Sequence, residues 1–217
     1  MDISIRLPRS LAFEPPTASF DAIGHALDSL IADVCEHDRY TGDHSCRVSD
    51  YAEALGRVLG LDDDDVVFLR QAGLAHDIGK IGIPDELLTK SGPLSDDEFN
   101  LIKTHPLVGA NLLARIKGME RMVPVARHHH ERWDGTGYPS GLAGVDIPIG
   151  ARIVFVADAF DAMTSRRPYG RVLSTEQALA ELRRCSGRQF DPVMVDAMHS
   201  AYHNGLIDDL ALAPSGL

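Results

Sequence analysis

Residues 74–85 read Leu-Ala-His-Asp-Ile-Gly-Lys-Ile-Gly-Ile-Pro-Asp, and this stretch places a histidine beside an aspartate at the end of an apolar helix. Apolar and small residues recur at helical spacing from Val66 to His76, so the His76 imidazole is predicted to point with the buried stripe. Gly79 is predicted to end the helix, and Lys80 follows it directly.

Asp77 is the chemically unusual residue of this stretch. A charged carboxylate beside a core-facing imidazole is costly in an apolar interior unless a cation compensates it. A metal ion would do so, because imidazole and carboxylate suit zinc, iron or manganese and one carboxylate can bridge two ions. The alternative is a core histidine that merely caps a helix, and for an isolated His-Asp pair that alternative is the more common one.

The composition is that of a soluble globular domain. The 217 residues are 44% hydrophobic and 24% charged, which suits one domain of moderate size with a full core. A net charge of -11 argues against a nucleic-acid polymer as the main partner, while a small anionic ligand remains compatible with it.

Cysteine usage and hydropathy indicate the compartment. Cys35, Cys46 and Cys185 are scattered and lack metal-type spacing, which favours a reducing environment. No apolar run approaches the ~20 residues of a membrane span, and no signal pattern opens the chain. A cytoplasmic location without a membrane contact is therefore expected.

The chain is expected to divide into three parts. Residues 1–16 contain three prolines and are interpreted as a loose lead-in. The domain is assigned to 17–205 and a tail to 206–217. Its first helix, about 17–34, carries one apolar stripe and is interpreted as a core helix or as a homodimer contact.

Further helices are predicted from apolar periodicity and from capping signals. The first runs from about Gly42 to Gly60, and the next is opened by the acidic run 62–65. A short helix is capped by Ser95 and Glu98, and Pro106 is the first residue of another. A further helix begins at Gly150, and two more are predicted at 176–184 and 192–202. The acidic run is interpreted as helix caps, because the alternating ligand pattern of a calcium loop is absent. Glycines between 135 and 150 predict a long loop able to approach a ligand closely.

Several of these segments carry a histidine or carboxylate on the face that is expected to be buried. They are His44, His76, Asp77, His105, two of the run 128–130, and Asp158. Successive histidines fan out over about 200° of a helix, so at most two of that run can aim at one point. The set is too large for one tetrahedral ion, but it suits two octahedral ions bridged by a carboxylate and water, as in two-metal phosphoester hydrolysis.

The order and spacing of these residues resemble the HD-GYP phosphodiesterases of the HD superfamily. The matching segments are Tyr40–Val48, His76–Asp85, His105–Gly109, His129–Pro139, Val156–Tyr169 and Gly187–Pro192. The resemblance covers roughly residues 18–205. It implies an all-α bundle with an extra N-terminal helix, and hydrolysis of the bacterial second messenger cyclic di-GMP by a hydroxide that bridges two ions.

The resemblance also implies a set of site residues. A first ion would take His44, His76, Asp77 and Asp158. A second ion would take Asp77, His105, His129 and His130, which leaves His128 out. The implied metal is iron or manganese rather than zinc. Asp77 and Lys80 would be the catalytic residues, Lys80 by stabilising the phosphate or the leaving oxygen. Substrate contacts are implied for Tyr138, Asp161, Arg167 and Arg171.

Two departures from the family pattern limit these expectations. Tyr40 stands where some members carry a glutamate that holds a third metal, so two ions are expected here. Gly170 interrupts the basic stretch after Tyr169, which leaves open whether the product is the linear dinucleotide or GMP.

Two other functions stay open from the sequence. One is a catalytically weak module that acts by binding, with the Gly137–Pro139 loop as the contact for a signalling protein. The other is an HD hydrolase for a different cyclic dinucleotide, such as cyclic GMP-AMP.

Overall fold

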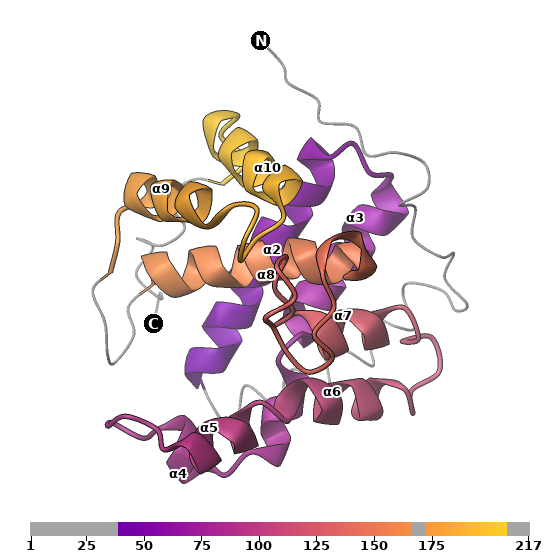
Figure 1. Cartoon of the computed structure of the whole chain (residues 1–217). Helices are drawn as coiled ribbons and strands as arrows, with labels where there is room; N and C mark the ends of the chain where they lie inside the picture. Colours follow the sequence, from indigo (N-terminus) through magenta and orange to yellow (C-terminus); the bar gives the residue numbers. More distant parts are fainter. Residues whose placement is uncertain (1–38, 166–171, 208–217) are drawn as a thin grey trace.

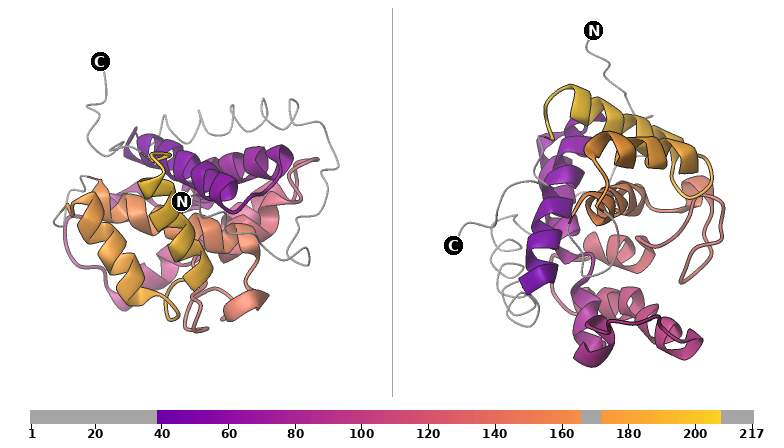
Figure 2. Two further views of the ribbon diagram at one scale, coloured as in Figure 1. Left: turned by 90° about the horizontal axis from the view of Figure 1, so that it is seen from above. Right: turned by 90° about the vertical axis from the view of Figure 1, so that its left-hand side faces the viewer.

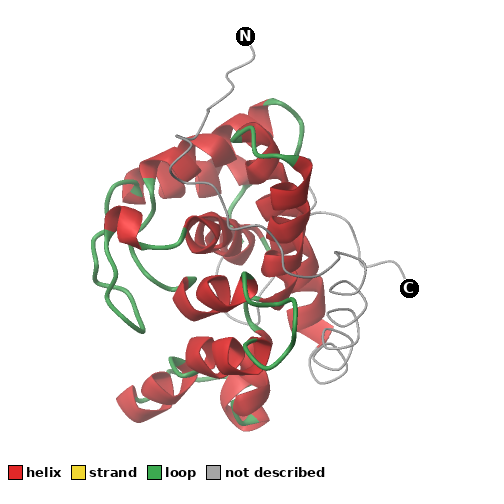
Figure 3. Cartoon of the chain, turned by 90° about the vertical axis from the view of Figure 1, so that its right-hand side faces the viewer, coloured by secondary structure: helices red, strands yellow, loops and turns green. Residues whose placement is uncertain are grey.

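The computed structural model describes residues 39–165 and 172–207, and within these ranges every named element is a helix. This confirms the predicted all-α class (Figure 3). The helices are α2 Arg39–Val58, α3 Asp63–Ala75, α4 Asp85–Leu88, α5 Asp96–Ile102, α6 His105–Leu113, α7 Met122–His128, α8 Ile149–Thr164, α9 Thr175–Cys185 and α10 Pro192–His203, with short 3-10 turns η2 Ile78–Gly82 and η3 Gly144–Asp146. The predicted lead-in 1–16, the helix at 17–34 and the part of the tail after residue 207 lie outside the described residues.

Helix α8 runs through the middle of the bundle. Its sequence is apolar on nearly every side, and most of its residues are buried, as expected of a helix without a polar face. It contacts α2, α3, α7, α9 and α10. Figures 1 and 2 place α9 and α10 at one end of the bundle and α4 and α5 at the other.

Two glycines bring the segments around His76 close to their neighbours. A Cβ atom added to Gly73 would lie 2.7 Å from the Ser49 Cα atom, so α3 can approach α2 only because this residue has no side chain. A Cβ atom added to Gly79 would lie 2.0 Å from the His105 carbonyl oxygen, so η2 lies directly against the start of α6. These contacts position His76 between the helix that carries His44 and the helix that carries His105.

The predicted helix end at Gly79 is therefore wrong. Helix α3 ends at Ala75, and Gly79 lies inside η2. Glycine is needed at this position because the backbone lies against α6, and not because the residue forms a left-handed helix cap.

Other helix starts follow the predicted chemistry. Asp62 caps α3 by accepting from the Asp65 N–H, and Ser95 and Glu98 form the predicted capping box of α5. Helix α6 starts one residue earlier than predicted, because His105 is already helical before the proline. The N–H groups of Leu107 and Val108 donate to the Thr104 carbonyl oxygen. The first turn therefore closes without a donor from Pro106.

None of the described helices is long and apolar enough to span a membrane.

Candidate metal centre

Asp77 lies between α3 and η2, and four imidazoles lie near its carboxylate. Its Oδ1 atom is 3.2 Å from His105 Nε2 and 3.7 Å from His129 Nε2. Its Oδ2 atom is 3.3 Å from His76 Nε2 and 3.9 Å from His44 Nε2. All five side chains are buried, so these charged and polar groups face one another rather than water.

In three of these histidines, the hydrogen bond of the Nδ1 atom fixes the tautomer of the ring. The Nδ1 atoms of His76, His105 and His129 each lie against the backbone carbonyl oxygen three residues earlier, at 2.7, 2.8 and 2.9 Å. A carbonyl oxygen only accepts, so each Nδ1 carries the hydrogen and donates it. In the neutral ring, Nε2 therefore presents a lone pair, and all three lone pairs converge on Asp77.

Because the Nε2 atoms of these rings carry no hydrogen, some buried acceptor atoms near Asp77 receive no hydrogen bond. His105 Nε2 and His129 Nε2 are 3.2 Å apart, although neither carries a hydrogen in this tautomer. His76 Nε2 and Asp77 Oδ1 are buried and have no hydrogen-bond partner within the described part of the chain. Orphaned buried acceptors of this kind are costly unless a cation lies among them, so the donor set fits a metal ion.

Among the residues that the structure describes, two groups of side chains have ligand atoms within 4.8 Å of one another, and Asp77 belongs to both. One group is His44, His76 and Asp77; the other is Asp77, His105, His129 and His130. Asp158 lies beside the first group, with Oδ1 3.3 Å from His44 Nε2. The structure thus brings together every residue predicted as a ligand. The predicted number of ions and their identity remain predictions.

The protonation of His129, His130 and Asp77 suits metal ligands at neutral pH. Burial lowers the pKa of His129 to about 4 and that of His130 well below its usual range, so both rings are neutral. Burial would raise the pKa of Asp77, but the nearby Lys80 ammonium group outweighs it and helps to hold this pKa well below its usual range. His44 differs: burial is outweighed by its hydrogen bonds with Asp158 and Asp161, which raise its pKa to about 9.

The loop after α7 folds back onto the histidine run. A Cβ atom on Gly137 would lie 2.3 Å from the Arg132 N atom, so only glycine allows this return. The Tyr138 ring then stacks on His130, with centroids 4.9 Å apart and planes at 28°. His128 points elsewhere, with Nδ1 3.5 Å from Glu131 Oε1, as expected from the fan of three successive histidines.

Lys80 lies at the solvent side of the cluster. Its ammonium group forms an ion pair with Asp77 Oδ2, and 28% of its side chain is exposed. It is therefore a cation that touches the buried centre and still reaches solvent. This position agrees with the predicted catalytic role, which no contact in the structure tests.

Asp161, an expected substrate contact, lies inside the bundle, and its contact with substrate stays a prediction. This side chain is completely buried in α8, and its carboxylate is bonded to His44, Arg47 and Ser165. The Asp161–Arg47 pairing was missed, although Arg47 follows His44 by three residues and Asp161 follows Asp158 by three, spacings that place each pair on one helix face. Arg167 and Arg171 lie outside the described residues, and the side chain of Tyr40 is likewise not described.

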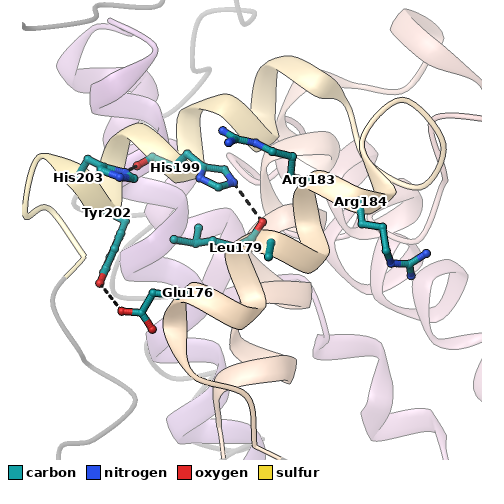
Figure 4. A pocket seen from close by; sticks show the side chains of 8 residues that line it. Glu176, Leu179, Arg183, Arg184, His199, Tyr202 and His203 are labelled. Carbon is teal, nitrogen blue, oxygen red and sulfur yellow. Dashed lines mark hydrogen bonds between the residues drawn. The ribbon is translucent and has the colours of Figure 1, made fainter.

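A separate groove of about 480 Å³ lies between α9 and α10 (Figure 4). It is lined by Glu176, Leu179, Ala180, Arg183, Arg184, His199, Tyr202 and His203. It shares no residue with the cluster around Asp77, and its His199 is bonded to the Leu179 carbonyl oxygen. The cluster, rather than this groove, is therefore the candidate site.

Comparison with known sequences gives one family and several relatives. Residues 26–194 match the HD domain family. The chain is 46% identical over 154 residues to the cyclic di-GMP phosphodiesterase response regulator RpfG of Xanthomonas campestris pv. campestris, covering 70% of this chain and 41% of that protein. It is 40% identical over 164 residues to 3'3'-cGAMP-specific phosphodiesterase 2 of Vibrio cholerae, covering 74% and 31%. The chain thus spans less than half the length of either relative.

Comparison with solved structures supports the fold. The HDG"Y"P protein Bd1817 of Bdellovibrio bacteriovorus superposes with a TM-score of 0.61 at 22% identity, over 84% of this chain and 62% of that one. At this identity, the likeness concerns the arrangement of helices.

Proposed function

The chain belongs to the HD domain family, and on that premise we propose that it is a metal-dependent phosphodiesterase that hydrolyses cyclic di-GMP. The observation that carries the proposal is the convergence of three histidine lone pairs on the buried carboxylate of Asp77. The similarity to RpfG, which is named as a cyclic di-GMP phosphodiesterase, supports the choice of substrate.

Two ions would be held by the two groups that share Asp77. The first ion would take His44, His76, Asp77 and Asp158, and the second would take Asp77, His105, His129 and His130. The donors are imidazole nitrogens and carboxylate oxygens without a thiolate, which supports iron or manganese. When bound, such ions supply Lewis-acid polarisation of the phosphoryl group.

The residues of the chain supply positioning and charge. Lys80 is placed to meet the negative charge that develops on the phosphate or the leaving oxygen, because its ammonium group touches the centre and still reaches solvent. Tyr138 would line the substrate side of His130. Burial and the nearby Asp77 and Asp158 carboxylates raise the pKa of Tyr138, so its hydroxyl stays protonated and can donate to a phosphate oxygen.

Hydrolysis of cyclic GMP-AMP is the second candidate, because one relative at 40% identity is named as specific for it. Both substrates contain the same kind of reacting phosphodiester bond, so the cluster around Asp77 would serve either. Discrimination must come from groups that contact the bases. Arg167 and Arg171 remain predicted substrate contacts, for the phosphates.

Protein contacts remain predictions as well. We retain the N-terminal helix at 17–34 as a homodimer contact and the Gly137–Pro139 loop as the contact for a signalling protein. The chain spans less than half the length of these relatives, so any partner of the whole protein is likewise a proposal.

The proposed function is tested by loading metal-free protein anaerobically with Fe²⁺ or Mn²⁺ and incubating it with each cyclic dinucleotide. We expect chromatography to show the linear dinucleotide from cyclic di-GMP, loss of this product with a chelator, and recovery when metal is restored. The chelated sample is the matched control, with its helicity checked by circular dichroism. If fully loaded protein linearises no cyclic dinucleotide, the proposal fails and a binding module becomes the better account.

A further inference from the structure

His44 is held by a different kind of partner from three other histidines of the cluster. Where His76, His105 and His129 donate from Nδ1 to a backbone carbonyl, His44 Nδ1 lies 2.6 Å from the Asp161 Oδ2 atom. An ionised carboxylate only accepts, so His44 Nδ1 carries a hydrogen and its Nε2 faces the ligand side. This Nε2 atom is 3.3 Å from Asp158 Oδ1.

Asp161 is itself fixed on both oxygens. Arg47 Nε donates to Oδ1 at 2.5 Å, and Arg47 Nη2 donates to Oδ2 at 3.2 Å. Ser165 Oγ donates to Oδ1 at 2.9 Å. The carboxylate is buried, and its Oδ2 atom lies against the His44 ring. It also joins α8 to α2 across 117 residues of sequence.

We propose that Asp161 is a positioning residue for His44 and thereby sets the metal affinity of the His44, His76 and Asp77 group alone. A carboxylate that accepts from the distal ring nitrogen fixes the tautomer and the ring orientation, and it raises the basicity of the ligating nitrogen. The group of His105, His129 and His130 lacks this control, because its Nδ1 contacts at His105 and His129 are backbone carbonyls. The inference rests on the proposed two-ion centre.

The test compares Asp161→Asn with two control variants. Asparagine keeps the size of the side chain, but its NH₂ group cannot accept a hydrogen bond. It therefore cannot replace both carboxylate oxygens, which accept from His44 and Arg47. Ser165→Ala removes one bond to Oδ1 and leaves the Oδ2 contact with His44 intact. Asp191→Asn is the matched control for the loss of a buried carboxylate, because Asp191 pairs with buried Arg152 at 2.6 Å and contacts no predicted ligand.

The readout is binding of Mn²⁺ to metal-free protein, followed by calorimetry and by electron paramagnetic resonance. We expect two binding events in the parent protein. In Asp161→Asn, one event should weaken at least roughly tenfold while the other keeps its affinity, and the signal of a coupled ion pair should become that of a single ion. Ser165→Ala and Asp191→Asn should both match the parent.

A second variant guards against misfolding. Combining Arg47→Gln with Asp161→Asn removes the guanidinium that would otherwise lose its buried partner. We expect this double variant to lose the same single binding event. The inference would be overturned, and the proposed function would not, if the Asp161 variants bound both ions with the affinities of the parent protein. The same holds if Asp191→Asn weakened one binding event as much as Asp161→Asn does. A parent protein that binds no Mn²⁺ would overturn the proposed function as well.

Discussion

Asp77→Asn is expected to remove both ions and to slow hydrolysis of cyclic di-GMP at least about a thousandfold, or about 4 kcal/mol of transition-state stabilisation. Asp77 belongs to both groups of ligand atoms, and each of its oxygens faces two imidazoles. The amide has no charge to offset two divalent ions, and its NH₂ group cannot act as a ligand. Elemental analysis and initial rates on the same purified sample measure both effects.

The control for this variant is Asp191→Asn, which also neutralises a buried carboxylate but leaves the cluster untouched. It should keep full metal content and the parent rate. If Asp77→Asn itself retained both ions, the shared carboxylate would not be needed for binding, and the assignment of Asp77 as the bridge would be wrong.

Lys80→Ala is expected to keep both ions while the chemical step slows about a hundredfold, which corresponds to about 2.7 kcal/mol. An ammonium group at neutral pH has no free lone pair, so Lys80 holds no metal, and its proposed contribution is to charge that develops in the transition state. Single-turnover kinetics with protein of measured metal content separate the two effects.

Lys90→Ala is the matched control for Lys80→Ala, because Lys90 is an exposed lysine that pairs with Glu98 away from the cluster. It should hydrolyse at the parent rate. A parent rate in Lys80→Ala would exclude a catalytic role for this residue. A loss of metal in Lys80→Ala would instead show that Lys80 is needed to hold the metal ions, and its assignment to the chemical step alone would be wrong.

The proposed ligand set could be predicted from the sequence because each proposed ligand lies on a buried stripe or at a helix end. His76 follows the apolar residues of α3, and Asp158 sits within an apolar helix, so both point inward for reasons that one helix alone contains. The resemblance to a known family then supplied the pairing of these residues, which periodicity alone leaves undetermined.

Features that depend on contacts between helices were missed or misassigned. Gly79 reads locally as a helix end, yet its role comes from the backbone of His105 lying against it. Asp161 reads as a polar residue near a site, yet its direction is set by Arg47 on α2. Helix α4 was missed because four residues are too few to show a period.

The sharing of Asp77 by two ions is tested most directly by anomalous diffraction at the manganese edge from crystals of Mn²⁺-loaded protein. Two peaks are predicted, one beside His44 and His76 and the other beside His105, His129 and His130, with Asp77 contacting both. A single peak, peaks remote from Asp77, or a third well-occupied peak would contradict the two-ion centre.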